Sequence, residues 1–286
     1  MTPVRTVDTD KRTAPFFSTE HERLLGYLRR AREAPEAPPA EALVEQYAPA
    51  VRETAVATWK LRMVNEHRSS SVFAGLLPQL IECSSGLDAQ TVVLRMAMDE
   101  VHHAALCGRV VAAFGAEPVA NAEPALTPLP RHDEVSPLER AMRNAMFVGC
   151  LAETVAVALV SEERELSSEP MVRWTLDQIL GDEVSHARFG WTFVEQALTA
   201  LEPAARDRTG EYLKVAFGYL ERRELELLPP APDLSTELRA QRESLGLCDG
   251  ALARDLFFET LRTVVIPRLE SLGLPAARAW RERAAA

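Results

Sequence analysis

The sequence predicts an all-α protein, built as a four-helix bundle with additional N-terminal and C-terminal helices. Apolar residues recur every three or four positions over long stretches of the 286-residue chain, which is the period of an amphipathic helix. Capping residues and prolines punctuate these stretches, and no segment has the period-two alternation of a half-buried strand. A chain of this length can bury a substantial core, as one large domain or as two ordinary ones.

We expect three regions along the chain. Residues 1–48 form an N-terminal arm and a lead-in helix, residues 49–203 form the bundle, and residues 204–286 form C-terminal helices that pack on it. The arm is polar and aperiodic to about residue 17. The lead-in helix begins with a capping box, Thr19 and Glu22, and ends before the proline-rich run E-A-P-E-A-P-P-A.

The first two bundle helices are predicted from their apolar stripes. One runs from Pro49 to about Glu82, with Pro78 bending its last turns. Asp88 is expected to cap the second helix, which ends at Gly115. A loop with four prolines follows and is long enough to carry the chain along the length of a bundle.

The third bundle helix has the strongest start signal. The run S-P-L-E at 136–139 supplies an N-cap serine, an N1 proline and an N3 glutamate, which predicts a helix to about residue 165. The remaining helical patterns follow in order: 170–201, 204–228, 249–269 and a last turn or two after Pro275.

Composition and charge exclude some classes of partner. The formal net charge of −10 lacks the cationic excess that binds phosphate backbones or anionic lipid, so we expect neither nucleic acid nor membrane as a partner. The N-terminus has no signal-peptide pattern, and the longest near-apolar stretch, 145–160, is too short to span a bilayer. The four cysteines include no C-x-x-C pair, which argues against zinc ribbons, rubredoxin-type iron sites and disulfide frameworks. We therefore expect a cytoplasmic protein with free thiols.

One short phrase occurs twice. The phrase D-E-V-H-H-A contains Glu100 and His103, and D-E-V-S-H-A contains Glu183 and His186. Residues three apart lie on one helix face, so each glutamate points the same way as its histidine. Both pairs continue an apolar stripe, and we expect both to be buried. A buried carboxylate needs a partner.

The other two core helices each add one glutamate. Glu66 lies in the stripe of the first helix, and Glu153 is the only acid in M-F-V-G-C-L-A-E-T-V-A-V-A-L-V. Four unpaired buried carboxylates would each lose several kcal/mol of hydration, and no lysine or arginine occupies these stripes. Two divalent cations would offset the carboxylates, and two neutral imidazoles would complete the ligand set. The spacing from the lone glutamate to the paired glutamate is similar in the two halves. It is 34 residues from Glu66 to Glu100 and 30 residues from Glu153 to Glu183.

With this pattern the chain resembles the ferritin-like di-iron carboxylate proteins over about residues 49–203. The resemblance implies a centre of two iron ions, with Fe/Fe and Mn/Fe both open and O2 as the co-substrate. Its ligands follow the family's order of Glu, Glu-x-x-His, Glu, Glu-x-x-His: Glu66, Glu100, His103, Glu153, Glu183 and His186. The resemblance also implies that Asp99 and Asp182 each orient the histidine of the opposite pair. The arginine that often precedes the family's ligand histidine is absent, because His102 and Ser185 stand there.

These residues also allow other interpretations. A single Glu-x-x-His is usually an exposed, charged helix face, but two copies with matched lone glutamates favour a metal site. Glu66 is the least specific ligand, because Glu53 and Glu82 lie on the same segment at less suitable depths. His102 points about 100° away from His103, which favours a surface or supporting role. Cys107 is more typical of a buried structural thiol than of a redox group.

The resemblance implies an O2-dependent non-haem di-iron oxidase or oxygenase that acts on a small organic substrate with an external electron donor, as in specialised metabolism. Hydroxylation, N-oxygenation, desaturation and oxidative cleavage stay open, although the N-oxygenases of antibiotic pathways add a third histidine where Ile179 stands. No catalytic residue is assigned beyond the metal ligands, and we expect a homodimer. Residues one turn from the ligands are expected to line an apolar pocket: Met63, Ser70, Met96, Cys107, Cys150, Val157 and Ile179.

Two alternatives remain at this stage. The first is a ferroxidase or peroxide-scavenging iron protein of the ferritin or rubrerythrin kind. The missing C-x-x-C pairs argue against a rubrerythrin, and the residues beyond the fourth helix exceed what a storage shell needs. The second is a helical interaction module that binds metal only for stability.

Overall fold

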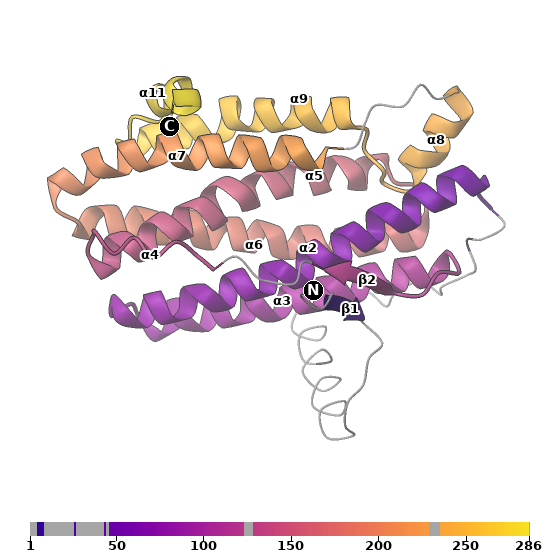
Figure 1. The fold of residues 1–286 in the computed structure, drawn as a ribbon, viewed down its shortest axis with the longest axis horizontal. Coiled ribbons are helices and arrows are strands. Elements are labelled where there is room, and N and C mark those ends of the chain that lie inside the picture. The colour runs from indigo at the N-terminus through magenta and orange to yellow at the C-terminus, as the bar shows by residue number, and fades with distance from the viewer. Residues whose placement is uncertain are drawn as a thin grey trace.

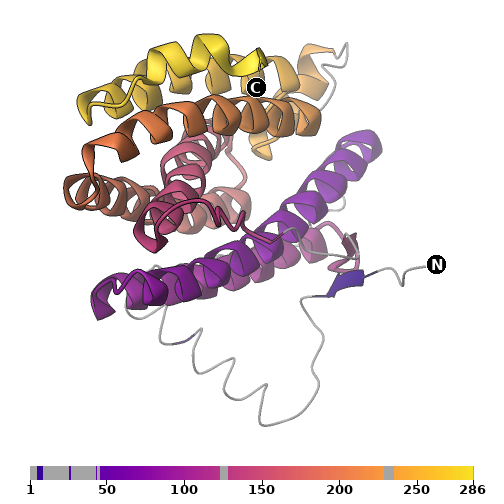
Figure 2. The same cartoon turned by 60° about the vertical axis from the view of Figure 1, so that its left-hand side comes forward.

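The computed structural model describes residues 5–8, 26, 43, 46–122, 128–228 and 235–285. These residues are almost entirely helical, which confirms the predicted all-α class (Figure 1). The helices lie in three layers, and Figure 2 shows the layers one above another. The lead-in helix predicted over 19–34 lies outside the described residues, except for Gly26, which is helical.

The first layer is a helical hairpin. It consists of α2, Pro49–Glu82, and α3, Leu87–Ala113, which pack along each other (Figure 1). Pro78 lies inside α2 near its end, as predicted. Gly115 follows α3 with a φ of 76°, a left-handed conformation that glycine adopts without strain.

The predicted cap of α3 was wrong. Gly86 precedes the first helical turn, and Asp88 lies within that turn. The Asp88 carboxylate accepts a hydrogen bond from the backbone N–H of Ala89 at 2.9 Å. An acid at this position still interacts favourably with the positive end of the helix dipole, so the sequence signal marked the right turn and the wrong residue.

The middle layer contains the third and fourth core helices. Ser136 caps the third helix, where its hydroxyl accepts from the backbone N–H of Glu139 at 3.3 Å. A π-helical segment that the sequence analysis did not anticipate divides this helix in two. The layer therefore has four elements: α4, Pro137–Ala145; η2, Met146–Ala152, the π segment; α5, Glu153–Leu166; and α6, Pro170–Ala200.

The third layer covers the middle one (Figure 2). A continuous apolar cluster joins its helices to η2, α5 and α6. This layer contains six elements: α7, Pro203–Leu227; α9, Gly250–Thr260; η3, Leu261–Val265, a second π segment; α10, Ile266–Ser271; α11, Ala276–Glu282; and η4, Arg283–Ala285.

Three short elements were not predicted. Helix α8, Thr236–Ser244, buries none of its residues, so it has no apolar stripe from which to predict it. Strand β1, Arg5–Asp8, pairs antiparallel with β2, Val119–Ala122. The expectation of an aperiodic arm without a strand was therefore wrong, because a four-residue ribbon is held by backbone pairing and needs no alternating side chains.

One stretch among the described residues is long and apolar enough to cross a membrane. It is Pro137–Leu166, and 61% of its most apolar window is buried inside the protein, as expected of a core helix. The predicted cytoplasmic location stays a prediction.

The π segment lies where two glycines bring backbones together. A Cβ built on Gly149 of η2 would lie 2.5 Å from the Cα of Gly190 on α6, and a Cβ on Gly190 would lie 2.5 Å from the Gly149 backbone. Contacts this short are possible only between glycines. The close approach fixes η2 against α6 at the point where Glu153 follows.

Alanine at Gly190 is expected to lower the free energy of unfolding by about 3 kcal/mol, because overpacked backbone must move apart. The matched control is Gly181→Ala on the same helix. A Cβ at Gly181 meets nothing within 4 Å, so this change should raise stability by roughly 0.5–1 kcal/mol through helix propensity. Denaturant unfolding measures both variants. Equal stability of the two variants would contradict the close packing.

Candidate metal centre

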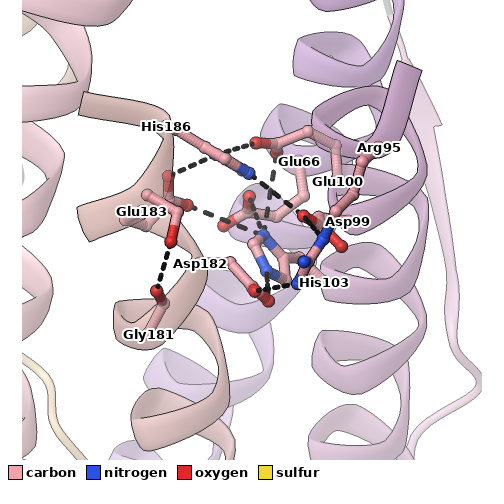
Figure 3. Close-up of polar contacts among 10 residues, drawn as sticks. Glu66, Arg95, Asp99, Glu100, His103, Gly181, Asp182, Glu183 and His186 are labelled. Carbon is pink, nitrogen blue, oxygen red and sulfur yellow. Dashed lines mark hydrogen bonds and ion pairs between the residues drawn. The ribbon is translucent and has the colours of Figure 1, made fainter. Parts of the chain in front are cut away.

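The six predicted ligands lie close together inside the helices. Figure 3 shows five of them: Glu66, Glu100, His103, Glu183 and His186. The ligand atoms of all six form two groups, each with all its atoms within 4.8 Å of one another. One group contains Glu66, Glu100, His103 and Glu183, and the other contains Glu100, Glu153, Glu183 and His186. Glu100 and Glu183 belong to both groups and therefore lie between the two positions that a metal ion can take.

Each ligand is positioned by its helix. Glu66 comes from α2, the pair Glu100 and His103 from α3, and the pair Glu183 and His186 from α6. Glu153 is the first residue of α5, directly after the π segment. Single π turns inside helices occur frequently at functional sites, because the extra residue redirects the side chains that follow.

The cluster is almost entirely removed from solvent. His103 and His186 are 0% exposed, Glu100 is 1% exposed and Glu183 is 4% exposed. Glu153 is slightly more accessible at 8%, and the Glu66 side chain is 13% exposed. Carboxylates in such an environment require compensating positive charge or protons.

Both histidines turn the same ring nitrogen toward the carboxylates. The Nδ1 atom of His103 lies 3.6 Å from Glu66 Oε2 and 3.6 Å from Glu183 Oε1. The Nδ1 atom of His186 lies 3.1 Å from oxygens of both Glu100 and Glu183. Nδ1 is therefore the atom of each imidazole that can bind a metal.

The opposite ring nitrogens face aspartates from the neighbouring helix. His103 Nε2 on α3 lies 3.0 Å from Asp182 Oδ2 on α6, and His186 Nε2 on α6 lies 3.5 Å from Asp99 Oδ2 on α3 (Figure 3). An N–H donated to a carboxylate keeps the proton on Nε2, so that Nδ1 has its lone pair free for a metal. The two Glu-x-x-His helices are thus cross-linked through their own ligands.

Sequence reasoning missed Arg95. Its guanidinium Nε lies 3.4 Å from Asp99 Oδ2, and its Nη2 lies 3.8 Å from Asp182 Oδ1, so that it connects both aspartates (Figure 3). The sequence contained one signal for it, because Arg95 precedes Asp99 by four residues on the same helix. Arg95 therefore supplies a cation to the aspartates, although no arginine directly precedes either of the two ligand histidines.

The two acids considered as alternatives to Glu66 lie outside the cluster. Glu53 is exposed, and Glu82 forms an ion pair with Arg140 at 3.0 Å. His102 is buried, with 3% exposure, so a surface position is wrong for it. Cys107 is also fully buried, and burial raises the pKa of its thiol far above the ordinary value.

The buried groups share protons in the absence of a metal. Burial raises the pKa of Glu66 to about 7, and burial together with the charge of Glu183 raises the pKa of Glu153 well above its ordinary value. Burial also acts to raise the pKa of Glu183, but hydrogen bonds with His186 and Glu153 outweigh it and lower this pKa to about 2. Burial lowers the pKa of His103, but the hydrogen bond with Asp182 and the nearby carboxylates of Glu100 and Glu66 outweigh that effect, so this pKa is well above its ordinary value.

Two atoms of the cluster have no hydrogen-bond partner among the described residues. They are Glu100 Oε2 and His103 Nδ1, and both are buried. A buried polar atom without a partner costs roughly 1–3 kcal/mol. Both atoms belong to the ligand groups, so a metal ion would satisfy them. The donor set of carboxylate oxygens and imidazole nitrogens fits iron, manganese or zinc, and the geometry does not choose among them.

Two cavities border the cluster. One has a volume of about 820 Å³ and reaches Glu153, and the other has a volume of about 600 Å³ and reaches Asp99 and His186. Of the seven residues expected to line a pocket, Met96 lines the smaller cavity. The other six line neither cavity: Met63, Ser70, Cys107, Cys150, Val157 and Ile179.

Metal binding is expected to release protons and to strengthen as pH rises from about 6 to 8. A carboxyl whose pKa is raised keeps its proton below that pKa, and a metal must displace it, so the Glu66 value of about 7 places the change near neutrality. Calorimetric titration with Zn²⁺ in two buffers of different ionisation enthalpy counts the protons. Glu66→Gln removes one titrating group and should flatten the pH dependence. Affinity that falls with rising pH would contradict this description.

Comparison with protein-family models and with curated proteins finds no match to the sequence, so any family assignment must come from the arrangement of the site itself.

Proposed function

We propose that this protein is an O2-dependent non-haem di-iron oxidase or oxygenase that acts on a small organic molecule. The observation that carries the proposal is the convergence of four carboxylates and two imidazoles into two overlapping ligand groups. A chain that bound metal only for stability would need one closed site. Two adjacent positions that share Glu100 and Glu183 are instead typical of dimetal carboxylate centres.

The proposed architecture is a ferritin-like four-helix bundle over residues 49–203. Helices α2, α3, α5 and α6 each contribute ligands, in the order Glu, Glu-x-x-His, Glu, Glu-x-x-His. Packing of α2 on α3, α5 on α6 and α3 on α6 supports this arrangement. The π segment and the layer formed by α7 to α11 are additions to the bundle.

The residues of this chain have separate roles in the proposed reaction. The carboxylates and the two Nδ1 atoms hold the ions, and bound ferrous iron supplies the two-electron reduction of O2. Asp99 and Asp182 keep the imidazole proton on Nε2. Phe73 packs against His186, with ring centroids 5.1 Å apart, and helps to exclude water. Further electrons come from an external donor.

The cavity that reaches Glu153 favours an organic substrate over iron storage. Its volume of about 820 Å³ is in the range of small-molecule sites, and its walls are largely apolar. A ferroxidase site needs a polar path for hydrated iron. Iron storage or peroxide scavenging is the competing function, and the fate of added iron separates the two.

Ligand variants should lose metal in a pattern set by the two groups. The protein is expected to bind about two Fe²⁺ per chain under anaerobic conditions, Glu66→Ala and Glu153→Ala about one, and Glu100→Ala or Glu183→Ala almost none, because these two residues serve both positions. Metal analysis after gel filtration measures the content.

The matched control is Glu195→Ala, which removes an exposed acid from the same helix as Glu183. It should bind metal like the unaltered protein. Thermal unfolding of the metal-free variants shows whether they fold. An equal loss in all four ligand variants, with folding intact, would contradict the shared-ligand arrangement.

Iron should be oxidised and retained only at the dimetal centre, without growth of a storage core. When about twenty Fe²⁺ per chain are added in air, an oxygenase retains about two, whereas a storage protein oxidises and retains most of them. Gel filtration followed by iron analysis distinguishes these results. Retention of a large iron core would refute the proposal, and so would rapid consumption of peroxide as the sole substrate.

A further inference from the structure

The larger cavity lies between the proposed bundle and the third layer. Residues of α2, of η2 and of α7 line it, together with the segment 128–132. Glu153, which is 8% exposed, is one of its buried lining residues. Val215 and Tyr219 of α7 are 54% and 48% exposed, and they mark its mouth. The cavity thus connects solvent with a ligand of the dimetal centre.

The walls of this cavity are mainly apolar. Aliphatic and aromatic side chains from four segments of the chain form them: Val72, Phe73, Leu129, Phe147, Val148 and Ala216. Phe73 and Val148 are buried, and Val72 is half-buried. A long apolar group would therefore replace water in the inner part of the cavity with favourable contacts.

The cavity also has an excess of arginine, although the chain as a whole has a net charge of −10. Two of these arginines are held by carboxylates: Arg143 by Glu134 and Glu139, both at 2.8 Å, and Arg208 by Glu139 and by Glu202 at 3.0 Å. The acidic lining residue Glu211 is likewise paired, with Lys214 at 2.8 Å.

Arg223 also lines the cavity, and its charge acts on the adjacent carboxylate of Glu224. Arg68 and Arg222 line the cavity too, and neither forms an ion pair with a carboxylate in the described part of the chain. Arg222 is exposed and Arg68 is half-buried. A guanidinium binds a carboxylate or phosphate through paired N–H donors, and this interaction strengthens beside an apolar wall. Unpaired positive charge in the wall of an apolar cavity favours anions and selects against cations.

From this arrangement we propose that the cavity binds an amphipathic organic carboxylate, with its anionic head at Arg68 and Arg222 and its apolar body extending toward Glu153. The inference names the substrate class and rests on the proposed function. It also gives α7 a role, because one helix of the C-terminal layer supplies Arg222 and one wall of the site. The carbon presented to the dimetal centre would be distant from the carboxylate.

The test compares four ligands of equal chain length on Zn²⁺-loaded protein: decanoate, decanol, decylammonium and decylphosphonate. Decanoate should bind at least about tenfold more tightly than decanol, which corresponds to about 1.4 kcal/mol, and decylammonium should bind most weakly. Calorimetry or displacement of a fluorescent probe measures the affinities. Equal binding of decanoate and decanol would overturn the proposal, and tighter binding of decylphosphonate would overturn the choice of a carboxylate.

A double variant separates recognition from folding. Arg68→Gln with Arg222→Gln should weaken decanoate about tenfold and leave decanol within about twofold. Arg281→Gln, which removes an exposed arginine on α11, is the matched control and should change neither. If the double variant lost both ligands equally, the two arginines would be structural and the proposal would be wrong.

Orientation is measured with the Co²⁺-loaded protein. Paramagnetic relaxation should be faster for the terminal methyl protons of decanoate than for the protons beside its carboxylate. The reverse order would place the head on the metal and overturn the proposal. These binding measurements require no turnover, so a failure of the proposed O2 chemistry in the iron-retention experiment is distinguishable from a failure of the carboxylate inference.

Discussion

The structure depends on the placement of four carboxylates and two imidazoles among apolar side chains. Water cannot solvate this cluster, because its members are between 0% and 8% exposed apart from Glu66. Without a metal the charges are balanced by protons, as the raised pKa values of Glu66, Glu153 and both histidines show. Divalent cations would replace those protons, so the same cluster of side chains would serve both the folded chain and the metal site.

The backbone is adapted to this cluster at one particular place. Gly149 and Gly190 allow η2 and α6 to approach more closely than any side chain would permit, and the π segment ends at the residue before Glu153. The aspartate–histidine contacts then join α3 to α6, and Arg95 joins the two aspartates. Close backbone packing therefore positions η2 against α6, and contacts between charged side chains position α3 against α6.

Much of this arrangement could be predicted because helix period and burial act together. The stripe that predicted 49–82 ends at the observed residue, and the six candidate ligands that lie together are acids and histidines on stripes of that kind. Features without a side-chain pattern could not be predicted. Helix α8 has no fully buried residue, the β ribbon is held by its backbone, and the π segment lies at a contact between glycines distant in sequence. Arg95 lies four residues before Asp99, but this spacing indicates a role only once its contacts with Asp99 and Asp182 are known.

Proximity to a ligand along a helix does not identify the residues that line these two cavities. Residues one turn from a ligand on an apolar stripe, such as Met63 and Ile179, are 0% exposed, because the stripe is where the helices are packed together. The larger cavity lies instead where one layer meets the next. Helix α7 forms one of its walls, and no sequence motif near the ligands predicts this. In the proposed enzyme the chemistry is therefore held by α2 to α6, and the choice of substrate is made largely by a helix outside them. Variation on α7 could then change the substrate without disturbing the metal ligands.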